Sequence, residues 1–375
     1  MFYKNARIFT PDFTFKVGAF EVKDGVFGEI FPAQVPGDAV DLDGAVVIPG
    51  LIDVHNHGNS GADFSDGDYE GLKTMARYLL KSGITSFAPA SMTLPYDVLE
   101  KAFATGKMLR DQAPKGCARL VGIHMEGPYF SEKKKGAQNA AYLKDPDFEG
   151  FRKLYEDCGG LVRIVDVAPE LPGAEAFVEQ AKALCTVSVA HTDSDYDHAK
   201  AAFAAGASHL THLYNAMPAI HHRKPGVIPA AVENAGVQAE LICDGLHSHP
   251  ACVRLAFAMF PHRIVLISDA LRCCGMPDGQ YELGGQQVFL KGGVARLADG
   301  TIAGSATNLY DCMRNAIAFG IPEEEAVRSA TWNPAKAVGA LDRIGSIETG
   351  KMADFLICTP DYSSKRVFLN GREVI

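Results

Sequence analysis

Apolar runs alternate with amphipathic stretches through the middle of the chain. The runs fall near residues 51–54, 84–90, 120–125, 162–168, 186–190, 208–211, 239–243 and 264–268. Between most of them lie Ala-rich stretches with helical spacing, such as YEGLKTMARYLLKSG and YDHAKAAFAAGA. Repeated β-then-α units predict a parallel sheet, and eight units are the number that closes a (β/α)8 TIM-like barrel. An open, doubly wound sheet is the alternative.

The two ends of the chain have a different pattern. Residues 1–50 consist of short β-like pieces broken by Gly, Pro and Asp, with hardly any helical periodicity. The last 35 residues look the same and contain an Asn-Gly turn at 370–371. We therefore predict a small β-sandwich built from both termini, residues 1–50 plus 341–375, beside a barrel domain over 51–340. Residues 280–302 follow the eighth apolar run and predict an inserted β-hairpin.

Composition limits the class of protein. The chain has 375 residues, a formal net charge of −9 and nine cysteines. An acidic chain argues against nucleic acid or an anionic membrane as the main partner, and no apolar run reaches the roughly 18 residues of a membrane span. The cysteines are scattered without a CxxC pair, which fits reduced thiols better than a disulfide framework. We expect a cytoplasmic protein with neither a membrane nor a nucleic-acid partner.

Imidazole and carboxylate groups stand at the ends of several predicted strands. The C-terminal ends of barrel strands share one face, so side chains placed there should converge. They are His55 and His57 after the first strand, Glu126 after the third, His191 after the fifth and His212 after the sixth. Each one alone is as well explained by a satisfied core position or a cap. Together they form the ligand set of a borderline divalent cation such as Zn²⁺ or Fe²⁺.

Asp269 and a basic cluster complete the candidate chemistry. Asp269 follows the eighth apolar run. In a metal-dependent hydrolase, one carboxylate beside the metal can take a proton from the attacking water and then protonate the leaving group. A helix N-cap is the alternative for Asp269. The cluster His221-His222-Arg223-Lys224 offers local positive charge for a small anion such as phosphate, or is a solvated loop.

Several motifs carry a family resemblance over nearly the whole chain. PGLIDVHNHG, HMEGPY, ISDA and ATWNPAKAVG resemble the amidohydrolase superfamily. Within it, HMEGPYFSEKKKGAQ, THLYNAM, CDGLHSHP, AGSA and GKMADF closely resemble the N-acetylglucosamine-6-phosphate deacetylase family. The resemblance implies metal-dependent hydrolysis of the acetamide of N-acetyl-D-glucosamine 6-phosphate, giving D-glucosamine 6-phosphate and acetate in amino-sugar catabolism.

Three alternatives stay open beside that activity. The first is N-acetylgalactosamine-6-phosphate deacetylase, and the second is another amidohydrolase, such as a deaminase or a cyclic amidase. The cyclic amidases commonly carry a metal-bridging carboxylated lysine at the end of the fourth strand, where this chain has Asp166-Val167-Ala168-Pro169 and no lysine. The third alternative is a catalytically inactive relative that binds amino-sugar phosphates.

The resemblance also implies roles for individual residues. It implies that the principal metal ligands are Glu126, His191 and His212. It also implies that His55 and His57 bind a second ion, with Glu126 bridging the two ions. We therefore expect one or two Zn or Fe ions per chain. It makes Asp269 the general base and acid. It assigns binding of the sugar phosphate to Asn215, Ala216, Arg223 and His247. It assigns contact with the acetamido end of the substrate to a loop containing Ile302, Ala303 and Gly304. The family is often dimeric, and the arginine can come from the neighbouring subunit of a homodimer.

Gln138 departs from the family pattern. It lies twelve residues after Glu126, where some members have a histidine thought to polarise the amide carbonyl. A glutamine side chain can donate a hydrogen bond but cannot transfer a proton as a general acid. We therefore expect Gln138 to contact the substrate and the metal to do more of the polarisation.

Overall fold

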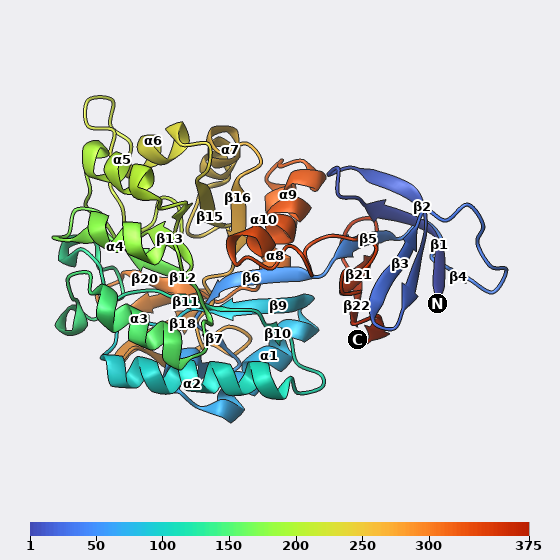
Figure 1. Cartoon of the computed structure of the whole chain (residues 1–375), viewed down its shortest axis with the longest axis horizontal. Coiled ribbons are helices and arrows are strands. Elements are labelled where there is room, and N and C mark those ends of the chain that lie inside the picture. Colours follow the sequence, from blue (N-terminus) through green and yellow to red (C-terminus); the bar gives the residue numbers. More distant parts are fainter. Residues whose placement is uncertain (375) are drawn as a thin grey trace.

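The computed structural model describes residues 1–374 and has a parallel β-barrel at its centre (Figure 1). Its eight strands are β6 (Leu51–Asn56), β9 (Ile84–Pro89), β11 (Ile123–Met125), β12 (Val162–Val167), β13 (Thr186–Val189), β14 (His209–Leu210), β15 (Gln238–Ile242) and β16 (Ile264–Ile267). β6 pairs with β9, and β11 to β16 pair in chain order. Bridges Ala90–His124 and Asn56–Ala270 join the two groups into a ring. The predicted barrel is confirmed, and the open sheet is wrong.

A helix follows each barrel strand. These helices are α1 (Tyr69–Lys81), α2 (Tyr96–Gln112), α3 (Phe148–Asp157), α4 (Ala174–Ala181), α5 (Tyr196–Ala205), α6 (Val227–Glu233), α7 (Pro250–Met259) and α8 (Leu309–Ala318). In α1, Leu72, Met75, Ala76 and Leu79 recur at helical spacing and are buried in the main core. The Asp68 side chain accepts hydrogen bonds from the first-turn amides and so begins this helix.

Both ends of the chain contribute strands to one small sheet. From the N-terminal end come β1 (Phe2–Phe9), β2 (Phe15–Lys23), β3 (Val26–Ile30), β4 (Val40–Asp41) and β5 (Val46–Pro49). From the C-terminal end come β21 (Phe355–Cys358), β22 (Lys365–Leu369) and β23 (Arg372–Glu373). β21 pairs antiparallel with β5, so strands from the two ends of the chain lie side by side at one end of the molecule (Figure 1). The predicted unit from both termini is confirmed, while its limits at residues 50 and 341 stay a prediction.

The small sheet has its own aromatic core and is tied to the barrel domain. Phe20, Phe27 and Phe355 are buried together in it. α9 (Glu323–Ala330) and α10 (Trp332–Ala337) lie between the two parts (Figure 1). Arg7 of β1 makes a two-pronged ion pair with Glu323.

The insertion after the eighth strand is larger than the predicted hairpin. It is a four-stranded antiparallel sheet made of β17 (Gly279–Leu283), β18 (Gln286–Lys291), β19 (Val294–Leu297) and β20 (Ile302–Ser305). The diglycines 284–285 and 292–293 all have positive φ, so the chain reverses twice within a few residues. The prediction that Ile302, Ala303 and Gly304 form a loop is wrong, because they lie in β20.

Short elements complete the structure. They are β7 (Gly58–Asn59), β8 (Ala62–Asp63), β10 (Arg119–Leu120) and three turns of 3₁₀ helix at Phe64–Asp66, Glu132–Lys134 and Ala140–Tyr142. All nine cysteines are free thiols. Among residues 1–374, every helix is too short or too polar to cross a bilayer.

Candidate active site

All five predicted ligands converge around the Glu126 carboxylate, at the C-terminal ends of the barrel strands. The Nε2 atoms of His191 and His212 each lie 3.2 Å from Glu126 Oε1 and 3.0 Å from each other. On the other side, His57 Nε2 lies 3.2 Å from Glu126 Oε2, and His55 Nε2 lies 3.5 Å from Oε1. All five side chains are buried. We call these five residues the ligand cluster.

The ligand cluster has the donor set of a borderline divalent cation. It divides into two groups that share Glu126, one with His55 and His57 and the other with His191 and His212, and within each group the ligand atoms lie within 4.8 Å of one another. His55 Nε2 is fully buried without a hydrogen-bond partner in the described structure, as expected for an atom that binds a metal. Imidazole and carboxylate donors suit zinc or ferrous iron.

The electrostatics of the cluster favour bound positive charge. Burial alone would raise the pKa of Glu126, but the surrounding imidazoles, His57 first, hold this pKa well below its usual range. Burial alone would lower the pKa of His57, but the carboxylates of Glu126 and Asp269 raise it to about 10. A metal ion must therefore displace the proton of His57, so its binding beside this residue weakens in acid.

Asp269 stands at the edge of the cluster. Its Oδ1 lies 3.4 Å from His57 Nε2 and 3.7 Å from His55 Nε2. Its side chain is 12% exposed, against 7% or less for the five ligands. No helix begins directly after Asp269, since residues 270–278 of the described chain form a bridge, turns and irregular structure, so the N-cap alternative is wrong.

Gln138 reaches the cluster from the segment that follows the third strand. Its Nε2 donates to Glu126 Oε2 at 2.6 Å, and its Oε1 accepts from the Thr93 amide at 2.8 Å. The same segment orients His191, whose Nδ1 lies 2.9 Å from the Lys134 carbonyl oxygen. That carbonyl can only accept, so His191 Nδ1 carries the hydrogen and Nε2 presents its lone pair to the cluster.

Most of the predicted substrate residues lie beside this cluster. The Asn215 amide donates to the His212 carbonyl at 3.2 Å, and the Ala216 carbonyl accepts from the Thr192 amide at 3.1 Å. β20 lies against the eighth strand end, because the Ser305 amide donates to the Asp269 carbonyl at 2.8 Å.

His247 and Arg223 have contrasting surroundings. His247 is held by Asp244, with 2.7 Å between His247 Nδ1 and Asp244 Oδ2. Burial alone would lower the pKa of His247, but this partner outweighs burial and raises it, with Asp269 adding in the same direction. Arg223 lies in an exposed loop, where it contacts His222, and no contact joins it to the ligand cluster within the described chain.

The sequence reading missed a layer of polar groups inside the barrel. Glu240 contacts His55 and His209, and Asp166 accepts hydrogen bonds from His124 and Thr211. The sequence contains a feature that could have predicted these two buried carboxylates, because each interrupts an apolar run, in AELIC and in VRIVDVAP. A charge within a strand of a parallel sheet, which is buried on both faces, points to a partner inside.

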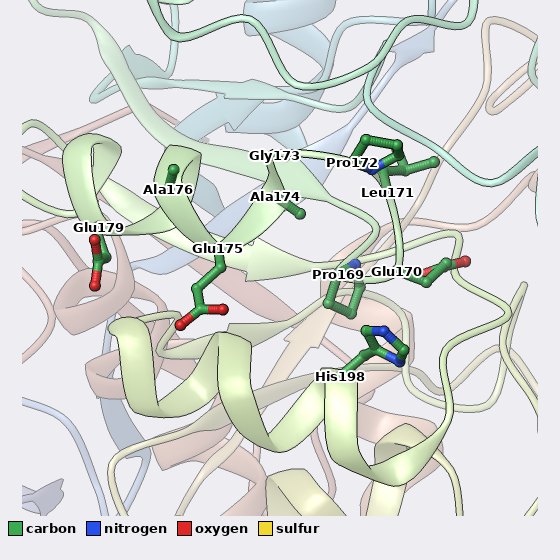
Figure 2. A pocket seen from close by; sticks show the side chains of 10 residues that line it. All are labelled: Pro169, Glu170, Leu171, Pro172, Gly173, Ala174, Glu175, Ala176, Glu179 and His198. Atoms are coloured by element: carbon green, nitrogen blue, oxygen red, sulfur yellow. The ribbon is translucent and has the colours of Figure 1, made fainter.

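A separate surface pocket of about 540 Å³ lies between the start of α4 and α5. Glu175, Glu179 and His198 line it, and none of the ligand cluster does (Figure 2). Glu170, at its edge, accepts hydrogen bonds from the Thr192 hydroxyl and the Asp193 amide. The pocket therefore borders the segment after His191 without opening on the cluster.

Comparison with known proteins agrees with the fold and the ligand cluster. The sequence pattern of the amidohydrolase family matches residues 46–374. The chain belongs to the amidohydrolase family, whose members depend on metal ions. Its similarity to an N-acetylglucosamine-6-phosphate deacetylase of Bacillus subtilis is 36% identity over 96% of this chain and 93% of that protein.

Two further relatives are informative. An N-acetylgalactosamine-6-phosphate deacetylase of Escherichia coli O157:H7 is 32% identical over 94% of this chain and 93% of its own length. Among solved structures, a mutant N-acetyl-D-glucosamine-6-phosphate deacetylase of Mycobacterium smegmatis, in complex with N-acetyl-D-glucosamine-6-phosphate, superimposes with a TM-score of 0.93. It shares 31% identity and covers 100% of this chain and 99% of its own.

Proposed function

We propose that this protein hydrolyses the acetamide of N-acetyl-D-glucosamine 6-phosphate, giving D-glucosamine 6-phosphate and acetate in amino-sugar catabolism. The observation that carries the proposal is the complete ligand cluster with Asp269 3.4 Å from His57. An inactive, merely binding relative would be expected to lack one of these groups. The B. subtilis relative, matched over nearly its full length, bears the name of this activity.

One or two divalent ions, zinc or iron, would polarise the acetamide carbonyl and lower the pKa of the attacking water. Glu126, His191 and His212 would hold one ion, and His55 and His57 would hold the second together with Glu126. Asp269 accepts the proton of the attacking water on its carboxylate and then delivers it to the nitrogen of the departing amine, which leaves poorly unless protonated.

The phosphate end of the substrate is held at a distance from the reacting bond. Asp244 raises the pKa of His247, which favours the imidazolium form that would attract a phosphate dianion in an acidic protein. Asn215 and Ala216 would contribute further hydrogen bonds to the sugar phosphate, and the backbone of residues 302–304 would meet the acetamido group. Remote binding of this kind orients the amide for attack.

The protein acts as a cytoplasmic homodimer in this proposal. Leu255 on α7 and Leu246, in the segment before it, are half-exposed large apolar side chains. In this proposal these two side chains would take part in the contact with a second copy. Arg223 reaches the phosphate of the neighbouring subunit, which accounts for its exposed position away from its own ligand cluster.

The test is acetate release from N-acetylglucosamine 6-phosphate, its galactosamine epimer and unphosphorylated N-acetylglucosamine, with metal content measured on the same sample. We expect a strong preference for the first substrate and one or two transition-metal ions per chain. A preference for the epimer would transfer the proposal to N-acetylgalactosamine 6-phosphate, the second candidate that the E. coli relative favours. Bound metal without turnover of any of the three would refute the proposed activity.

A further inference from the structure

A buried carboxylate lies beneath the ligand cluster, inside the barrel. Glu240 occupies the middle of β15 and has no exposed surface. Its neighbours Ala239 and Leu241 belong to the main apolar core, so the side chain of Glu240 points to the opposite face, the barrel interior. Barrel interiors are usually filled by branched apolar side chains, and a carboxylate there needs compensating partners.

Glu240 has such partners, and two of them are ligand residues. Its Oε2 lies 2.9 Å from His55 Nδ1 and accepts the backbone N–H of His212 at 3.2 Å. Its Oε1 lies 3.2 Å from His209 Nε2. The carboxylate thus contacts the first and the sixth strand ends at the same time.

The contact with His55 determines which of its nitrogens can bind a metal. An ionised carboxylate only accepts hydrogen bonds, so His55 Nδ1 carries a hydrogen and Nε2 is the nitrogen that can bind a metal. Within residues 1–374, that Nε2 is buried, has no hydrogen-bond partner and lies 3.5 Å from Glu126 Oε1. His191 is oriented differently, through the Lys134 carbonyl, and does not depend on Glu240.

We propose that Glu240 is a positioning residue for one of two metal ions: it fixes His55 in the tautomer and orientation that complete the His55–His57–Glu126 group. The proposal rests on the metal-dependent function proposed above and makes it more specific. Partners that orient a metal-binding histidine typically change metal affinity by about 10–100-fold.

The test is titration of the metal-free protein with Zn²⁺, followed by calorimetry and by metal analysis after dialysis. We expect two ions per chain for the unaltered protein. E240L removes the acceptor from His55 and should raise the Kd of the weaker ion at least tenfold. E240Q should behave like the unaltered protein, because the amide oxygen can still accept from His55 and the amide nitrogen can face His209. E240D keeps the charge but has a shorter side chain, so it should also weaken binding of this ion. E240D replaces E240L in the test if E240L does not fold.

A double-mutant cycle shows whether Glu240 acts through His55. The H55A variant should bind one ion. Adding E240L or E240D to H55A should change the Kd of that ion much less than the same substitution changes the Kd of the weaker ion, because Glu240 reaches the remaining ligands only through the His212 backbone N–H. Unchanged binding of both ions in E240L and E240D would overturn the proposal, as would binding of a single ion by the unaltered protein or an equally large loss in the H55A background. Acetate release by the unaltered protein in the same preparation tests the proposed function separately.

Discussion

Three residues of the site hold backbone conformations that L-amino acids rarely adopt. His191, His212 and Asp269 have φ of 42°, 30° and 49°, and each follows the end of a barrel strand. Such a conformation costs on the order of 1–3 kcal/mol per residue and persists only where the surroundings enforce it. Here the left-handed turn directs the side chain across the mouth of the barrel instead of along the next connection. At these three positions the strain falls on groups assigned to metal binding and proton transfer.

Asp269→Asn tests the proton-transfer role. The amide has the size of the carboxylate but cannot accept a proton from water, so kcat should fall by roughly 10²–10⁴-fold. The ligand cluster is left intact, and metal content should stay that of the unaltered protein. Near-normal turnover with normal metal content would remove Asp269 from the role of base.

Gln138→Ala separates support of Glu126 from contact with the substrate. The variant loses the hydrogen bond from Gln138 Nε2 to Glu126 Oε2. A hydrogen bond to a charged group contributes about 1.5–3 kcal/mol, so we expect weaker metal binding together with a lower kcat. Isothermal titration with Zn²⁺ and steady-state kinetics measure the two effects. An unchanged kcat would exclude Gln138 from the mechanism.

His247 predicts how substrate affinity depends on pH. Its pKa in the folded protein is raised above about 6.5, so its positive charge is present at lower pH and is lost as pH rises through the folded pKa. KM for the phosphorylated substrate should rise over that interval. In Asp244→Asn the ion pair is lost, and the rise should begin at lower pH. Unphosphorylated N-acetylglucosamine is the control, because its KM should not follow this titration; identical profiles in both proteins would contradict the assignment.

At the residue scale, the sequence predicted the ligands better than their supports. The five ligands and Asp269 lie within the last residues of a strand or just after it, so the barrel topology alone brings them together. The contacts of Gln138 could not be predicted, because its segment is irregular and its path depends on Thr93 and Glu126. The position of Arg223 relative to the ligand cluster could not be predicted either, because Arg223 also lies in an irregular segment.

At the scale of elements, the hydrophobic period explains why the barrel strands were predicted, and the glycine positions explain why the inserted sheet was underestimated. The eight apolar runs became the eight barrel strands because parallel strands are buried on both faces. The insertion was underestimated because QYELGGQQVFLKGGVARLADGTI contains two diglycine turns, and each adds a strand reversal. Its buried side chains Leu283, Val288 and Leu290 pack with Leu271, two residues after Asp269. The inserted sheet thus covers the segment that carries the proposed base.

Helix α1 offers a test of local stability that leaves the site untouched. The exposed Asp68 accepts hydrogen bonds from the amides of Glu70 and Gly71, at 3.2 and 3.1 Å. Asp68→Ala should lower the free energy of unfolding by about 1 kcal/mol, and Asp68→Ser should restore most of it. Chemical unfolding followed by circular dichroism measures the change. A loss of kcat in Asp68→Ala would show that α1 is coupled to the site, against this expectation.

At the scale of the whole molecule, the proposed dimer links surface and site. Leu255→Glu places a charge on the half-exposed face of α7 and should give monomers in light scattering. If Arg223 serves the neighbouring subunit, KM for the phosphorylated substrate should rise in the same variant, while metal content stays unchanged. The conservative Leu255→Met is the matched control and should remain dimeric. A Leu255→Glu protein that stays dimeric would show that α7 is not the interface.

The small sheet has a consequence for the order in which the molecule is completed. β5 leads directly into β6, the strand that carries His55, yet one of its edges is paired only when β21 arrives more than 300 residues later. Contacts between such distant parts of the chain form late. During synthesis, the N-terminal strands must therefore wait with an open edge until β21 has been made. A chain interrupted before residue 355 would keep that edge exposed, which makes it a substrate for aggregation or proteolysis.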